Sequence, residues 1–169
     1  MITIIPNLDK DFETIRTIAK IVWPVTYSAI LTKEQLEYMF DMMYSVTSLQ
    51  HQAQEKKHHF VIAYEDERPL GFASYEFDCE NSNKTKVHKL YILPNLQGKG
   101  IGKKIINFIE KEALNNLEKA VYLNVNRFNV AKNFYEKLGF SIVGEVDIEI
   151  GNGYLMEDYV MEKWIINKF

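Results

Sequence analysis

The segment from His88 to Lys103 holds the residue types and spacing that point most clearly to chemistry. A short apolar stretch, Leu90 to Leu93, ends at Pro94, and a loop with glycines at positions 98, 100 and 102 follows before helical spacing begins. In the first turn of a helix the N–H groups have no partner within the helix, and the helix dipole favours negative charge. Glycines let such a backbone approach a phosphate closely. Three lysines add positive charge: Lys99, Lys103 and Lys104. The segment therefore predicts a site for a phosphorylated cofactor.

The spacing of the loop distinguishes between known phosphate-binding motifs. A P-loop would need glycine where this chain has Gln97, and serine or threonine where it has Lys104. A dinucleotide fingerprint would need a third glycine where the chain has Lys103. The pattern Gln-x-x-Gly-x-Gly fits at Gln97, Gly100 and Gly102. This pattern resembles the pyrophosphate loop of the GNAT family of acyl-CoA N-acyltransferases.

A second segment, residues 119–140, carries the same resemblance. Apolar residues alternate with polar ones from Val121 to Val125, which predicts a strand. Helical spacing follows Asn129 and stops at Gly139, a residue typical of helix C-termini. The pattern Asn-x-x-Ala-x-x-Phe-Tyr-x-x-x-Gly-Phe runs unbroken from Asn129 to Phe140 and is similar to the other hallmark segment of the GNAT family.

The resemblance implies acetyl-CoA as the cofactor and assigns residues to it. Backbone groups of the strand that contains Leu90, Tyr91 and Ile92 would hold the pantetheine arm and polarise the thioester carbonyl. Asn129 and Tyr135 would also contact the cofactor, although Asn129 alternatively serves only as a helix N-cap. The pyrophosphate loop would comprise Gln97, Gly98, Lys99, Gly100, Ile101, Gly102 and Lys103.

Two residues are candidates for proton transfer. Tyr135 occupies the position at which the family has a tyrosine that protonates the departing thiolate; alternatively it is a core aromatic residue. Many family members carry a glutamate on the strand before the loop, where this chain has Lys86 and His88. His88 is the natural replacement as general base, and the alternative is a histidine that only packs on the strand.

The acyl acceptor is expected to lie between the first helices and the last hairpin, by resemblance to the family. Aromatic walls together with carboxylates suit a cationic primary amine. The carboxylates of these regions are Glu34, Glu37, Asp41, Asp147, Glu149, Glu157 and Asp158. The layout is similar to PaiA-like GNAT proteins, which implies a polyamine. A protein or peptide amine, an aminoglycoside, a non-catalytic CoA-binding sensor and a merely solvated acidic surface stay open as alternatives. The candidate acceptor-binding residues are Trp23, Tyr27, Tyr38, Tyr154 and Met156.

The resemblance implies an α/β (α+β) GNAT fold, a mixed, mainly antiparallel sheet of about seven strands with helices on both faces, in a single domain over residues 1–169. The sequence predicts that Asp9 or Asp11 starts the first helix and that Trp23-Pro24 ends it. Thr32 and Gln35 predict a capping box for the second helix. Expected strands are 2–5, 59–64, 70–77, 86–93, 121–125, 141–150 and 154–164, and Gly151-Asn152-Gly153 predicts a hairpin turn between the last two.

Composition narrows the class of protein. With 47% hydrophobic and 25% charged residues, the chain is typical of a globular domain, and we expect neither a membrane span nor a secretory signal. A net charge of −3 argues against nucleic acid as the main partner. One cysteine fits a reducing compartment, so the cytoplasm is expected. The histidines at 51, 58, 59 and 88 show no metal-ligand spacing. Because dimers are common among similar proteins, the resemblance also implies a homodimer.

Overall fold

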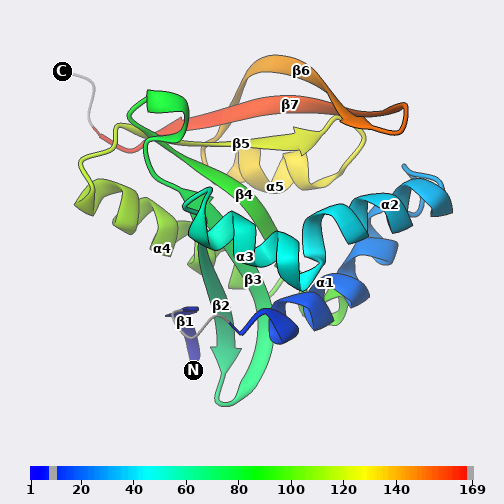
Figure 1. Cartoon of the computed structure of the whole chain (residues 1–169). Helices are drawn as coiled ribbons and strands as arrows, with labels where there is room; N and C mark the ends of the chain where they lie inside the picture. The colour runs from blue at the N-terminus through cyan, green and yellow to red at the C-terminus, as the bar shows by residue number, and fades with distance from the viewer. Residues whose placement is uncertain (8–10, 167–169) are drawn as a thin grey trace. The chain divides into compact units, whose positions relative to one another are not determined.

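The computed structural model describes residues 1–7 and 11–166, and it contains five α-helices and seven strands within those ranges (Figure 1). The helices are α1 (Phe12–Tyr27), α2 (Lys33–Tyr44), α3 (Val46–Gln54), α4 (Ile101–Asn115) and α5 (Ala131–Lys137). The strands are β1 (Ile2–Pro6), β2 (His59–Glu65), β3 (Arg68–Glu76), β4 (Lys84–Ile92), β5 (Ala120–Asn126), β6 (Ser141–Gly151) and β7 (Tyr154–Trp164). Among the described residues no helix is long and apolar enough to cross a membrane.

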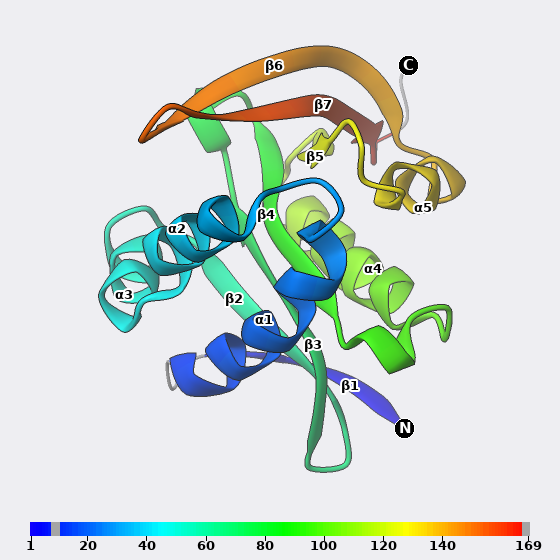
Figure 2. The same ribbon diagram turned by 90° about the vertical axis from the view of Figure 1, so that its right-hand side faces the viewer.

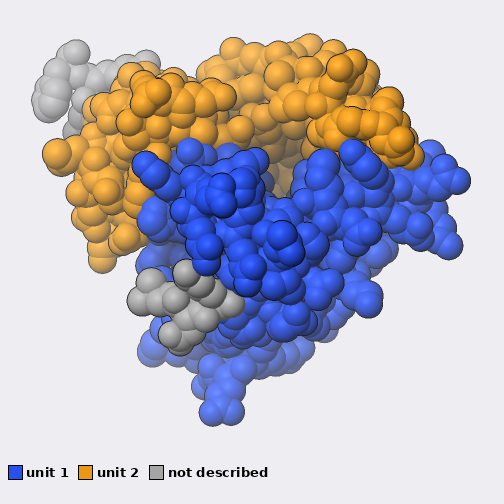
Figure 3. Space-filling model, in the orientation of Figure 1, with its two compact units in different colours: residues 1–76, 88–109 blue, residues 77–87, 110–169 orange. Residues whose placement is uncertain are grey.

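Hydrogen bonds connect the strands in the order β1-β2-β3-β4-β5-β7-β6. The β4–β5 pair is parallel, whereas β1–β2, β2–β3, β5–β7 and β6–β7 are antiparallel. The predicted mixed, mainly antiparallel sheet is confirmed. The chain forms two compact units, residues 1–76 with 88–109 and residues 77–87 with 110–169 (Figure 3). A single domain over 1–169 stays a prediction.

The first unit packs helices on both sides of its strands. Figure 2 shows α1, α2 and α3 on one side of β2–β4 and the start of α4 on the other. Phe12 of α1 meets Phe60 of β2 edge-on, with ring centroids 5.9 Å apart. Gly71 allows a close approach of β3 to β4, because a Cβ there would lie 2.5 Å from the Tyr91 carbonyl oxygen. This packing fixes the position of the strand that precedes the glycine loop.

Local signals set most helix ends, with one exception. Asp11 accepts a hydrogen bond from the Thr14 N–H at 3.2 Å and caps α1, while Asp9 lies outside the described residues. The capping box of Thr32 with Gln35 is confirmed. The prediction that Trp23-Pro24 ends α1 is wrong, since the helix continues to Tyr27. Pro24 lies in the last turn, where its missing N–H removes only one intrahelical bond. Burial of Trp23 and Tyr27 compensates for that loss.

The second unit contains the β6–β7 hairpin and α5. Asn152 and Gly153 have φ values of +53° and +76° in the hairpin turn, as the predicted Gly151-Asn152-Gly153 turn requires. Gly139 follows α5 with φ of +96°, so the predicted C-terminal glycine is confirmed. The hairpin turn connects β6 and β7, whose antiparallel register places Met156 opposite Ile148.

Candidate active site

The glycine loop delivers unpaired N–H groups at the start of α4. Gly98 and Gly100 both have φ of +80°, a conformation that favours glycine, and a Cβ at either would meet no atom within 4 Å. The Lys104 N–H bonds to the Gly100 carbonyl at 3.1 Å, so the N–H groups of residues 101–103 precede the first intrahelical bond. The arrangement is open, positively charged and suited to an anion.

An aromatic cluster in the first unit joins predicted acceptor residues to the predicted cofactor strand. The hydroxyls of Tyr27 and Tyr91 lie 3.0 Å apart. The Trp23 ring lies 4.7 Å from that of Tyr27 and 6.0 Å from that of Tyr91, between ring centroids. The Trp23 indole N–H donates to the Tyr44 hydroxyl at 3.1 Å. Burial raises the pKa of Tyr44 well above its usual value of 10.0. The cluster thus consists of packed aromatic rings whose hydroxyl and indole N–H groups bond to one another.

A pocket of about 370 Å³ opens between α1 and α2. Glu37 and Asp41 line this pocket together with Trp23 and Phe40. Lys20 also lines it, so the three charged residues of the lining carry one net negative charge. The remaining lining residues are Pro24 and Leu36. An apolar floor with an excess of carboxylate suits an amine attached to an aliphatic chain.

Lys89 of β4 is a buried cation that the sequence pattern did not single out. Its ammonium donates to Gln52 Oε1 at 2.5 Å. The same group lies 5.8 Å from the ring centroid of Tyr44 and 5.9 Å from that of Phe60. Burial, with a smaller effect of nearby Lys56, lowers the pKa of Lys89 to about 7. An amide and two aromatic faces are therefore the partners of this lysine.

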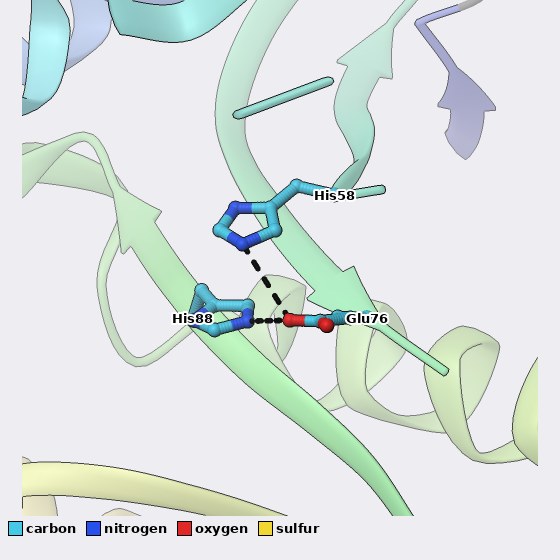
Figure 4. A group of neighbouring side chains, drawn as sticks. All are labelled: His58, Glu76 and His88. Carbon is cyan, nitrogen blue, oxygen red and sulfur yellow. Dashed lines mark hydrogen bonds and ion pairs between the residues drawn. The ribbon is translucent and has the colours of Figure 1, made fainter. Parts of the chain in front are cut away.

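His88 lies in a cluster with two side chains from other segments (Figure 4). Its Nε2 is 2.8 Å from Glu76 Oε2 at the end of β3, and His58 Nε2 is 3.6 Å from the same oxygen. A carboxylate only accepts hydrogen bonds, so His88 donates through Nε2, and in the neutral form of the ring the lone pair is then on Nδ1. His88, the candidate general base, thus has a carboxylate partner, and this partner comes from β3 rather than from β4, the strand of His88.

In the second unit the candidate acid and the candidate cap lie on one short element. Asn129 Oδ1 accepts from the Ala131 N–H at 2.9 Å, so Asn129 caps the first turn of α5. Tyr135 is buried, and its ring meets Phe134 and Phe140 edge-on at centroid distances of 5.1 and 5.8 Å. These contacts fix the ring and with it the direction of the hydroxyl.

The other predicted acceptor residues are half-buried. Tyr38 lies on α2, and Tyr154 and Met156 lie on β7. Within the first unit the structure brings Trp23 and Tyr27 against Tyr91, whereas Tyr38 does not line the pocket between α1 and α2. The predicted cofactor residues of this unit follow one another from the end of β4 into α4.

Asp158 of β7 is one of the carboxylates expected near the acceptor, and the sequence did not predict that it is buried. It is 4% exposed, and its Oδ1 has no hydrogen-bond partner among the described residues. Burial raises the pKa of Asp158 to about 6, against the opposing effect of Lys86 and Arg127. Asp158 follows Met156 by two positions, so the two side chains lie on the same face of the strand. This alternation is the signal in the sequence from which a buried acid could be predicted.

We expect Asp158→Asn to gain stability chiefly above pH 6. Between pH 3.8 and about 6 the folded chain binds a proton that the unfolded chain does not, so the free energy of unfolding falls as pH rises through this window. The amide lacks this effect. Urea denaturation measures the free energy of unfolding of the variant and of the parent. The variant's value minus the parent's value should be ~2 kcal/mol larger at pH 7 than at pH 4. An equal difference at both pH values would contradict the raised pKa.

Comparison with known proteins identifies the family. The model of the family described as "Acetyltransferase (GNAT) domain" matches residues 28–163. A spermidine N(1)-acetyltransferase from Thermoplasma acidophilum is 28% identical over 153 residues, which cover 88% of this chain and 91% of that protein. A PaiA N-acetyltransferase from the same organism, solved with coenzyme A, superposes with a TM-score of 0.80 at 27% identity, covering 97% of this chain and 99% of that chain. A GCN5-related N-acetyltransferase from Rhodopseudomonas palustris shares the fold, with a TM-score of 0.80 at 20% identity over 96% of this chain and 94% of that one. This chain therefore belongs to the GNAT family of acetyltransferases.

Proposed function

We propose that this enzyme transfers the acetyl group of acetyl-CoA to a primary amine of a small cationic acceptor, such as the polyamine spermidine. The thioester C–S bond breaks as the C–N bond forms, the amine loses one proton, and the CoA thiolate gains one. The spermidine acetyltransferase among the relatives supports this acceptor class. The relative solved with coenzyme A supports the cofactor.

The open backbone at the start of α4 supports the pyrophosphate site. The N–H groups of residues 101–103 would bind the phosphate oxygens, and the positive φ of Gly98 and Gly100 would bring the loop close to them. Leu90, Tyr91 and Ile92 at the end of β4 would hold the pantetheine arm with their backbone groups. Asn129 would contact the cofactor in addition to capping α5.

The single observation that carries the acceptor class is the pocket between α1 and α2. Its aromatic floor suits the methylene chain of a polyamine, and Glu37 and Asp41 suit an ammonium group. Trp23 belongs both to this pocket and to the aromatic cluster that contains Tyr91 of the cofactor strand. The acceptor would thus extend from the pocket toward the acetyl group along this cluster.

Two side chains would move the protons. His88 Nδ1 would accept the proton of the amine, directly or through water, while Glu76 fixes the tautomer through its hydrogen bond to Nε2. The Tyr135 hydroxyl would protonate the thiolate, held in direction by its contacts with Phe134 and Phe140. A cytoplasmic location and a homodimer also belong to this proposal; the single buried Cys79 supports the location.

Neutralising the pocket carboxylates tests the acceptor. We expect the double variant Glu37→Gln, Asp41→Asn to raise KM for spermidine about 5-fold, since two exposed ion pairs each contribute modestly to binding. The kcat and the KM for acetyl-CoA should stay unchanged. Glu34→Gln on the same helix is the matched control, because Glu34 does not line the pocket. An unchanged KM for spermidine in the double variant would place the acceptor elsewhere.

A further inference from the structure

Three side chains from three separate segments direct ligand-type atoms toward one point in the first unit. His58 precedes β2, Glu76 ends β3 and His88 lies in β4 (Figure 4). The two imidazole nitrogens and one carboxylate oxygen all lie within 4.8 Å of one another. The side chains are 7%, 24% and 19% exposed in chain order, so the point is sheltered yet still open to a further ligand.

The distances within this cluster match those between ligands of one metal ion. Donor atoms bound about 2.1 Å from a tetrahedral zinc ion lie about 3.4 Å from one another. The distances from Glu76 Oε2 to the two imidazole nitrogens, 2.8 and 3.6 Å, lie on either side of that value. The longer one exceeds an ordinary hydrogen bond, whereas both values lie within the range that two ligands of one ion span.

The rings of His58 and His88 are stacked, and this geometry limits how both can bind one ion. Their ring centroids are 3.9 Å apart and their planes differ by 15°. Two protonated rings in this stack would repel each other, whereas two neutral rings offer lone pairs. Because a metal ion lies in the plane of each ring that binds it, one imidazole must rotate about its side-chain torsions.

We propose that His58, Glu76 and His88 form a zinc-binding site. Two imidazoles and one carboxylate are a ligand set of open zinc sites, in which a fourth position takes water or another small ligand. Imidazole nitrogen excludes magnesium and calcium as preferred ions, since both favour oxygen ligands.

Zinc at this site would act as an inhibitor. For His88 Nε2 to bind zinc, the ring proton that it donates to Glu76 must move to Nδ1, so that Nε2 holds the lone pair for the metal and Nδ1 holds the proton. His88 could then no longer accept the proton of the amine. This consequence rests on the proposed function of His88, whereas the binding of zinc does not.

The test measures zinc binding to the full chain, freed of any affinity tag and treated with chelator, in the absence of substrates. Calorimetry should find one zinc ion per chain with a dissociation constant below ~10 µM and no comparable binding of Mg²⁺. His58→Gln and Glu76→Gln should each weaken binding at least ~10-fold. Circular dichroism identifies a variant that fails to fold, and the other variant then decides the result.

His51→Gln is the matched control, because His51 and Glu55 form an exposed pair with 3.1 Å between Nδ1 and the carboxylate. It should bind zinc like the parent chain. No binding by the parent, or full binding by folded His58→Gln or Glu76→Gln, would overturn the site. Zinc that binds as proposed without slowing acetyl transfer would support the site and contradict only the role of His88 in the proposed function.

Discussion

Tyr135→Phe is expected to lower kcat by ~100- to 10,000-fold, the usual contribution of general acid–base catalysis. The substitution removes one hydroxyl and keeps the ring that packs against Phe134 and Phe140, so folding and KM for acetyl-CoA should change little. Steady-state kinetics with a saturating amine provides the measurement. A loss confined to kcat would separate a proton donor from a residue that only fills the core.

Tyr64→Phe is the control for this substitution. Tyr64 is a half-buried tyrosine of β2 that has no assigned role in catalysis, and its variant should keep the kcat of the parent. If Tyr135→Phe lowers kcat by less than 3-fold, about 0.65 kcal/mol in activation free energy, the hydroxyl is not the acid. Tyr135 is then a packing residue of α5.

Gly100→Glu is expected to weaken acetyl-CoA binding at least ~100-fold. The new carboxylate would stand beside the N–H groups of residues 101–103, where the pyrophosphate should bind. The positive φ of +80° adds backbone strain of ~1–2 kcal/mol, so stability also falls. Calorimetric titration with CoA and acetyl-CoA measures the effect on binding.

Gly153→Glu is the control that separates the effect of backbone strain from the effect of a carboxylate in the phosphate loop. Gly153 has φ of +76°, and a Cβ there would also meet no atom within 4 Å, so the strain is matched. The residue lies in the β6–β7 turn, outside the phosphate loop. This variant should lose similar stability and bind acetyl-CoA like the parent chain. Equal binding by both variants would show that the Gln97–Lys103 loop does not hold the phosphates.

Contiguous signals in the sequence predicted most of the fold. The glycine loop, the capping box of Thr32 with Gln35 and the turn at Asn152-Gly153 each depend on a few neighbouring residues, and the structure has all three. A proline usually ends a helix, which is why the sequence predicts an end of α1 at Trp23-Pro24, whereas burial of Trp23 and Tyr27 sustains one further turn here. A local rule failed where tertiary packing decided the outcome.

Contacts between distant segments were beyond sequence reasoning. His88 was singled out from its strand, but neither Glu76 nor His58 carries a spacing that pairs it with His88. The pocket between α1 and α2 depends on how two helices pack, and the buried state of Lys89 depends on Gln52 of α3. Periodicity assigns a residue to one side of an element, whereas its neighbours on that side come from elements far along the chain.

Mass spectrometry of the amine after incubation with acetyl-CoA tests the central claim most directly. We predict that the full chain converts spermidine to a monoacetylated product, with release of one equivalent of CoA thiol per product, and that Tyr135→Phe scarcely does so in the same time. Peptide and aminoglycoside amines should react slowly or not at all. Thiol release without an acetylated amine, or acetylation of a peptide or aminoglycoside while spermidine stays unmodified, would contradict the account.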